Sequence, residues 1–180
     1  MPSISRDIQQ ILALAPGFSA TISSSGAPAA NTLLIESGSA RHPFNLPPGI
    51  ELRVVASRTY DAIASAAAAV VASGTATVET ALLGTPFVVV YRVGRITELL
   101  LRAFVRTSHV AMPNLIAGRE VVPELLQQDC TGPNISAQVL RLLQSAEARA
   151  EVQQGLAEVR ARLGQGGAIE RGAEIIARLV

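Results

Sequence analysis

The chain has 180 residues, 49% of them hydrophobic and 16% charged, which argues against a disordered chain and allows a core of domain size. Its formal net charge of +1 and its 3% of aromatic residues argue against a nucleic acid as partner, because that role needs a basic surface or stacking side chains. The single cysteine, Cys130, excludes an intrachain disulfide and fits a reducing compartment.

Signals for export or membrane insertion are not evident in the sequence. The first residues include Arg6 and Asp7 and lack the sustained apolar core of a signal peptide. Apolar stretches elsewhere are too short for a spanning helix. We therefore expect a cytoplasmic protein, which still allows contact with one face of a membrane.

The first half of the chain predicts strands that alternate with helices. The expected elements are a helix over residues 8–15, a strand over 18–22, an exit loop over 23–26, a segment over 29–34 that fits a helix, a connecting loop over 44–48, a strand over 49–55, a helix over 60–67, and strands over 68–72 and 87–91. This alternation is typical of a parallel sheet covered on both faces. We therefore predict an α/β fold with a doubly wound parallel sheet.

A basic amphipathic helix is predicted next. Apolar residues from Ile96 to Phe104 follow one stripe, whereas Arg95, Arg102 and Arg106 follow another. Two interpretations stay open: a surface helix with solvated arginines, or a helix that contacts an anionic lipid or a lipid-bearing substrate.

The last third predicts a functional loop and two terminal helices. Polar and turn-forming residues over 113–127 favour a loop that carries function, followed by a short helix, and residues 128–133 indicate a transition from helix to loop. Helices with narrow apolar stripes are expected over about residues 147–180. They would pack back on a single domain that spans residues 1–180, or on a partner such as a second copy of the chain.

The most informative segment is Ser-Gly-Thr-Ala-Thr-Val-Glu-Thr-Ala-Leu-Leu-Gly-Thr-Pro at residues 73–86, between two predicted strands. Its small residues lead into a helix whose first N–H groups have no intrahelical partner, which makes a natural seat for phosphate. Glu79, in the first turns of that helix, is able to accept hydrogen bonds from the vicinal hydroxyls of a ribose. This favours a nucleotide-sugar site. The alternative is that Thr75 and Thr77 only cap the helix and that Glu79 favours its dipole.

Three blocks of sequence resemble one family. They are the segment at residues 73–86, Val-Val-Val-Tyr-Arg at 88–92, and Pro-Asn-Leu-Ile-Ala-Gly-Arg-Glu-Val-Val-Pro-Glu-Leu-Leu-Gln at 113–127. In this order and spacing they resemble lipid-A-disaccharide synthase, over residues 50–180 well and over 6–49 loosely. The resemblance implies a Rossmann-like half of a GT-B glycosyltransferase, the half that holds the sugar nucleotide.

The resemblance also implies a reaction and a set of binding residues. The family joins UDP-2,3-diacylglucosamine to 2,3-diacylglucosamine 1-phosphate in lipid A biosynthesis of the Gram-negative envelope, as a peripheral inner-membrane enzyme that needs no metal or cofactor. Arg95, Arg102 and Arg106 would then lie near acyl chains and phospholipid head groups. The substrate-binding residues would be Ser73, Gly74, Thr75, Ala76 and Thr77 for the diphosphate, Glu79 for the ribose, and Tyr91, Arg92, Asn114 and Arg119 on the donor side of the cleft.

The chain departs from the family pattern at its N-terminal side. Family members have an N-terminal half with the acceptor site and the proposed catalytic base, and these 180 residues contain neither, so no catalytic residue is assigned and the chain alone is expected to be inactive. A Gly-Ser-Arg loop of the family has no match before Ser5-Arg6. His42 and His109 stand alone in the sequence, and His109 is interpreted as structural. Two other functions stay open: a non-catalytic nucleotide-binding or scaffold domain, and another UDP-sugar-dependent GT-B enzyme.

Overall fold

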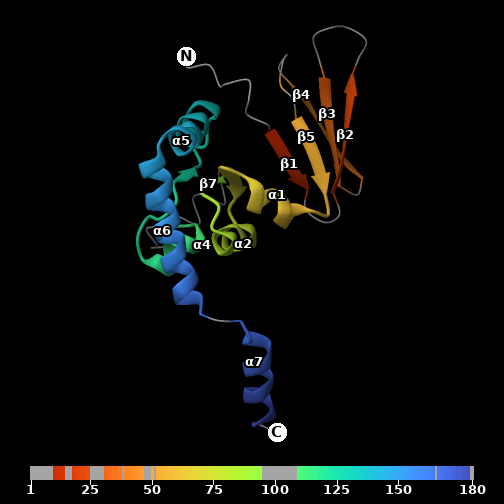
Figure 1. The fold of residues 1–180 in the computed structure, drawn as a ribbon. Helices are drawn as coiled ribbons and strands as arrows, with labels where there is room; N and C mark the ends of the chain where they lie inside the picture. The colour runs from red at the N-terminus through yellow and green to blue at the C-terminus, as the bar shows by residue number, and fades with distance from the viewer. Residues whose placement is uncertain are drawn as a thin grey trace. The chain divides into compact units, whose positions relative to one another are not determined.

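The computed structural model describes residues 10–14, 18–24, 31–37, 39–46, 50, 52–94, 109–164 and 166–178. The Cα positions divide the chain into two compact units, Met1–Ser65 and Ala66–Val180, and each unit has its own sheets (Figure 1). That the whole chain forms a single domain stays a prediction.

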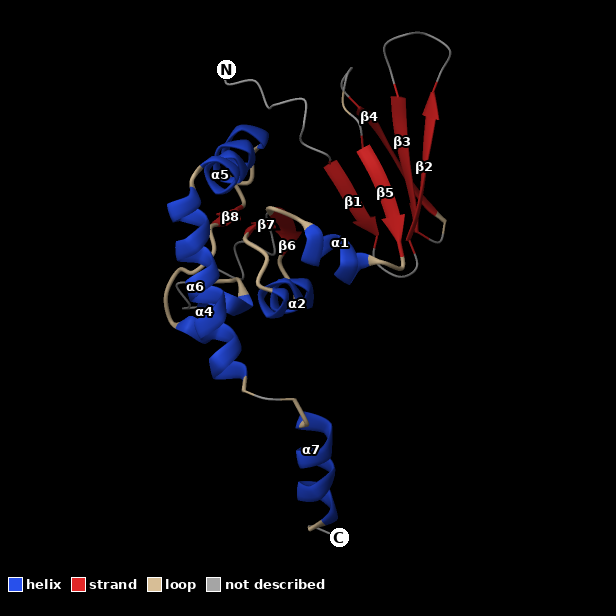
Figure 2. Ribbon diagram, in the orientation of Figure 1, coloured by secondary structure: helices blue, strands red, loops and turns tan. Residues whose placement is uncertain are grey.

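The first unit contains two small sheets and one helix. Its elements are β1 (Gln10–Leu14), β2 (Phe18–Ser24), β3 (Asn31–Ser37), β4 (Ala40–Leu46), β5 (Leu52–Ala56) and α1 (Thr59–Ser65). Strands β1 and β5 pair in parallel, with Leu12 opposite Val54, and α1 contacts both. Strands β2, β3 and β4 form an antiparallel meander in which Leu33, 5% exposed, lies opposite Phe44. Figure 2 shows these strands in red.

Several predictions for this unit are wrong. The helix expected over residues 8–15 is strand β1 where the chain is described, because its short apolar run pairs with β5 instead of forming helical turns. The segment over 29–34 is strand from Asn31 onward, held by a partner on each side, and the loop over 44–48 is strand β4 as far as Leu46. The strands expected over 18–22 and 49–55 and the helix over 60–67 are confirmed, with small shifts of their ends.

The second unit is built on a parallel sheet in the order β6–β7–β8. Its elements are β6 (Ala69–Ala72), α2 (Thr75–Leu83), β7 (Phe87–Tyr91), α4 (Met112–Ala117), β8 (Glu124–Leu126), α5 (Gly132–Gln144), α6 (Ala146–Leu163) and α7 (Ala168–Ala177). Strands β6 and β7 and helix α2 match the prediction closely. The α/β class with parallel strands is therefore confirmed, and it fits a Rossmann-like half. The antiparallel meander of the first unit is an addition that the prediction lacked.

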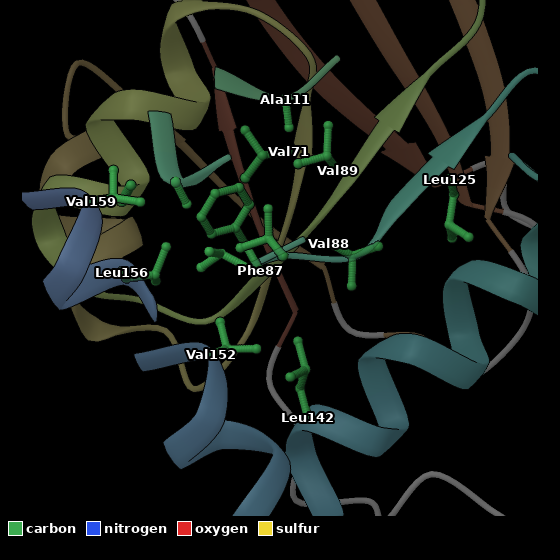
Figure 3. Close-up of a cluster of buried hydrophobic side chains, with 14 residues drawn as sticks. Val71, Phe87, Val88, Val89, Ala111, Leu125, Leu142, Val152, Leu156 and Val159 are labelled. Carbon is green, nitrogen blue, oxygen red and sulfur yellow. The ribbon is translucent and has the colours of Figure 1, made fainter. Parts of the chain in front are cut away.

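Strand β7 lies at the centre of the core. Phe87, Val88 and Val89 are each 0% exposed, and since successive side chains of a strand point to opposite faces, both faces of β7 are covered. Helices α5 and α6 supply much of this cover, with Leu142, Val152, Leu156 and Val159 in the same cluster (Figure 3). A strand buried in this way gives a rigid base for the loops that follow the strands.

The second part of this unit departs from the prediction. Residues 113–127 are not one loop, because they contain helix α4, a turn and strand β8. Cys130 lies in the turn from β8 into α5, a helix that the prediction missed, and not at the end of a helix. Helices α6 and α7 correspond to the two predicted terminal helices. The basic helix predicted over residues 95–106 falls outside the described residues.

Candidate functional site

The candidate site begins where β6 ends and α2 starts. Gly74 precedes the first helical residue with φ 144° and ψ −164°, a conformation that L side chains rarely adopt. A side chain that would cap the helix is absent here, since no side-chain hydrogen bond is formed at this cap. Glycine is therefore needed for the path of the chain, and the helix start is left without the usual Ser, Thr, Asp or Asn cap.

Three backbone N–H groups at this helix start are open. Within the described part of the chain, the N–H groups of Gly74, Thr75 and Ala76 have no hydrogen-bond partner, whereas the N–H of Thr77 donates to the carbonyl of Gly74 at 3.1 Å. Orphan donors of this kind, at the positive end of a helix dipole, favour an anion. The geometry therefore agrees with a phosphate seat at Gly74, Thr75 and Ala76.

The two threonines of this segment have different environments. Thr77 is fully buried, and its hydroxyl donates to the carbonyl of Gly74 at 2.6 Å, so it stabilises the turn from inside. Thr75 is exposed at the first helical position and forms no cap. The interpretation of both as helix caps is therefore wrong. Of the two hydroxyls, only that of Thr75 is accessible to a ligand.

Ser73 and Glu79 flank the open amides. The N–H of Ser73 donates to the carbonyl of Val90 at 3.0 Å, which extends the β6–β7 ladder by one residue and leaves this amide unavailable. Glu79 is four residues after Thr75, so the two side chains are neighbours on one face of α2. Because Glu79 lies in the second turn, the helix dipole, which acts within the first turn, does not explain its presence.

The carboxyl end of β7 lies next to this helix start. Tyr91 ends the strand, and Arg92 follows it as an exposed residue with no ion pair in the described part of the chain. Since parallel strands end at one edge of the sheet, Ser73, Arg92 and Gln127 follow three neighbouring strands at this edge. A cation and a set of free amides are thus brought to the same edge.

Asn114, by contrast, is closed within the protein. It is 0% exposed, and its side-chain oxygen accepts the N–H groups of Val121 and Val122 at 2.7 and 2.9 Å. Its side-chain nitrogen donates to the carbonyl of Val122 at 2.8 Å and to Glu124 Oε1 at 2.7 Å. With its oxygen and both amide hydrogens in use, Asn114 holds the turn before β8, and its role in donor binding stays a prediction.

Arg119 is exposed but is paired with a carboxylate of the protein. It donates to Glu158 Oε2 at 2.7 Å, and Arg162 donates to the other carboxylate oxygen at 2.6 Å. The hydrogen bond from Arg119, helped by the charges of both arginines, holds the pKa of Glu158 below its ordinary value. Arg119 thus joins the turn after α4 to α6, and its place on the donor side of the cleft stays a prediction.

Two residues that sequence reasoning missed shape this region. Glu124 accepts the N–H groups of Val110 and Ala111 at 2.9 and 3.1 Å, and His109 Nδ1 lies 3.8 Å from the same carboxylate. Gln127 binds the backbone of Val93 through both atoms of its amide. The sequence signal that could have pointed to Glu124 and Gln127 is their position on either side of the short apolar pair of β8.

These features define an α/β protein with a Rossmann-like parallel sheet and a candidate anion site at the carboxyl edge of that sheet. In the described residues, no helix is long and apolar enough to cross a bilayer.

Comparisons with known proteins identify the family. The model of the lipid-A-disaccharide synthetase family matches residues 1–178. A lipid-A-disaccharide synthase of Syntrophus aciditrophicus is 42% identical over 134 residues, which are 74% of this chain and 34% of that protein. The enzyme of the same name from Koribacter versatilis is 47% identical over 134 residues, with the same shares. That of Acidobacterium capsulatum is 55% identical over 102 residues, 57% of this chain and 26% of that protein.

The chain belongs to the lipid-A-disaccharide synthetase family, which confirms the resemblance seen in the three sequence blocks. It spans about a third of the length of the curated relatives that it matches.

Proposed function

We propose that this chain is the donor-binding half of a glycosyltransferase that forms the lipid A disaccharide, and that it holds the UDP part of the sugar nucleotide at the start of α2. The observation that carries the proposal is the N-terminus of α2 at the carboxyl edge of a buried parallel sheet, where three N–H groups have no partner among the described residues. Ligands of such sheets bind at that edge. Family membership supports the choice of a nucleotide sugar.

The proposed roles follow from the environments of the side chains. The amides of Gly74, Thr75 and Ala76, with the hydroxyl of Thr75, receive the diphosphate, and Arg92 adds a positive charge. Glu79 accepts hydrogen bonds from the ribose hydroxyls, and Tyr91 lines the same edge. When the glycosidic bond breaks, negative charge grows on the diphosphate, and fixed amides and an arginine stabilise it without reorganisation. Ser73 and Thr77 contribute by shaping the turn.

Further parts of the proposal concern the whole protein. UDP-2,3-diacylglucosamine is the proposed donor, and the lipid acceptor and the catalytic base belong to a region outside these residues. Contact with the inner membrane through Arg95, Arg102 and Arg106, and a homodimer, are proposed from the sequence alone. Sedimentation with anionic vesicles, before and after replacement of the three arginines by glutamine, tests the first. Light scattering at several concentrations tests the second.

A proline substitution tests the phosphate seat directly. Thr75 is the first helical residue, where proline fits the helix geometry and removes one N–H. We expect Thr75→Pro to bind UDP roughly tenfold more weakly than Thr75→Ala, because both lack the hydroxyl and only the proline lacks the N–H that bonds to the charged diphosphate. Thr75→Ala keeps the amide and is the matched control. Isothermal titration calorimetry measures both, and circular dichroism checks the fold.

The ribose role of Glu79 has its own pair of variants. Glu79→Ala removes the acceptor, whereas Glu79→Gln keeps one oxygen at the same distance. We expect the first to lose more UDP affinity than the second. If the unaltered chain binds no UDP at saturating concentration, the donor-binding proposal is wrong and a scaffold domain is favoured.

A further inference from the structure

Gln127 is the residue that follows β8, and its backbone is unusual. Its φ is +48°, in the left-handed region that glycine and asparagine occupy most easily. A glutamine held there has a cost of about 1 kcal/mol or more that the surrounding contacts must offset. Its own contacts indicate what offsets it.

Three hydrogen bonds join Gln127 to the chain that leaves β7. Its N–H donates to the carbonyl of Tyr91 at 2.9 Å. Its side-chain oxygen accepts the N–H of Val93 at 2.7 Å, and its side-chain nitrogen donates to the carbonyl of Val93 at 3.3 Å. The amide therefore pairs with both backbone groups of one residue, as a neighbouring strand would, beyond the point where β8 has ended.

The one residue between the two anchored positions is Arg92. On the other side of β7, the N–H of Ser73 is bonded to Val90, so the free amides of Gly74, Thr75 and Ala76 follow directly on that side. Gln127, on the β8 side of β7, thus fixes the backbone on both sides of Arg92. The start of α2 follows β6, on the opposite side of β7. Among side chains, only an amide offers both a donor and an acceptor in the geometry that a peptide group requires.

We propose that Gln127 is the positioning residue for Arg92: it fixes the backbone of Arg92 so that the guanidinium meets the diphosphate held by α2. This inference rests on the proposed function and adds to it a residue that acts without touching the nucleotide. The left-handed backbone of Gln127 is maintained because that conformation turns the side chain toward Val93.

The test measures UDP affinity of the full chain by calorimetry in four variants. Gln127→Ala removes the amide, and Gln127→Gly removes it while also relieving the left-handed backbone. Gln128→Ala, at the exposed neighbouring position, is the matched control. Arg92→Ala removes the cation. Thermal melting of each variant shows whether the fold is kept, and Gln127→Gly supplies the measurement if Gln127→Ala does not fold.

We expect both Gln127 variants to weaken UDP binding by roughly tenfold, because Arg92 then loses its hydrogen bond to the charged diphosphate, and Gln128→Ala to leave the binding unchanged. A double-mutant cycle separates positioning from general stability. With Arg92→Ala already present, Gln127→Ala should change the affinity by no more than about twofold, because its effect passes through Arg92.

The outcomes are distinguishable. If the unaltered chain binds UDP but Gln127→Ala matches Gln128→Ala, or its loss adds fully to that of Arg92→Ala, the positioning role is wrong and the proposed function stands. If the unaltered chain binds no UDP, the proposed function fails, and the role of Gln127 fails with it.

Discussion

The start of α2 and the segment from α4 to β8 both belong to the sequence blocks that resemble the family, yet they use their polar groups in opposite ways. At the start of α2, three N–H groups are free within the described residues, as are the side chains of Thr75 and Glu79. In the α4–β8 segment, Asn114 makes four hydrogen bonds and Arg119 is paired with Glu158. The first region is open and the second is closed.

The difference shows that polar residues in the sequence blocks that resemble the family have two kinds of role. Polar groups that are fully paired inside the protein stabilise a turn, because an unpaired buried group is costly. Polar groups left unpaired at a sheet edge are available to a ligand. The start of α2 lies at the end of a sheet that the α4–β8 segment helps to bury. The candidate site and its support are therefore separate in sequence but joined through the pairing of β7 with β8.

Loss of Asn114 is expected to have the largest effect and would break the closed region. Asn114→Ala leaves the N–H groups of Val121 and Val122 without partners in a fully buried place, so we expect the free energy of unfolding to fall by about 3–5 kcal/mol. Urea unfolding measures this. Asn134→Ala, at an exposed asparagine of α5, is the control and should cost less than about 1 kcal/mol. If Asn114→Ala lowered the free energy of unfolding only slightly, the hydrogen bonds of Asn114 would not support the α4–β8 segment as described.

A methyl group at Gly155 is expected to have the next largest effect. An added Cβ would collide with the side chain of Val121, so Gly155→Ala should overpack the contact between α6 and the turn before β8 and cost about 1–3 kcal/mol. Gly172→Ala on α7 is the matched control, since nothing lies within 4 Å of its added Cβ. Because alanine favours a helix more than glycine does, the free energy of unfolding of this control should rise by up to about 1 kcal/mol. If both variants gain stability, the close contact does not exist in solution.

Thr77 is a buried, hydrogen-bonded residue within the otherwise open start of α2, and its replacement is expected to lower stability. Thr77→Val keeps the shape but removes the hydroxyl that donates to Gly74, and we expect a loss of about 1 kcal/mol by thermal unfolding. Thr75→Val alters an exposed hydroxyl without a partner in the described structure and should be close to neutral. Equal effects of the two changes would refute the different roles given to these threonines.

The smallest effect is expected from Glu158, as a dependence on pH. Its pKa is lowered in the folded state, so its stabilising contribution is present at neutral pH and is lost as the pH falls through the lowered value. The difference in Tm between the unaltered chain and Glu158→Gln should therefore shrink from pH 7 to acidic pH. Salt should shrink it too, because the ion pairs are partly exposed. Glu174→Gln, at an exposed position of α7 beyond its first turn, is the control.

The central elements of the second unit were predictable from sequence for physical reasons. The run from Phe87 to Tyr91 is apolar without interruption, as a strand buried on both faces must be, and Gly84 to Pro86 ends the preceding helix. The helix α5 could have been predicted as well. Thr131 accepts the N–H of Asn134 as a cap and is followed by a proline, a start signal that stood in the sequence.

Other elements depend on contacts that a single segment does not reveal. The five residues of β1 and the seven of β3 have apolar patterns that fit either helix or strand, and pairing with distant strands decides between them. Within the candidate site, the sequence indicated the free helix start but not the burial of Asn114 or the pairing of Arg119. Polarity alone does not distinguish a side chain that faces a ligand from one that is paired inside.

The burial of strand β7 has a consequence for folding during synthesis. All strands of its sheet are complete once Leu126 has left the ribosome, but Val152, Leu156 and Val159, which seal the cluster around Phe87, follow later. Until helix α6 emerges, the nascent sheet has an apolar surface open to water, which invites chaperones or aggregation. The start of α2 is therefore synthesised before helix α6, and the sheet beneath it is covered only when α6 has emerged.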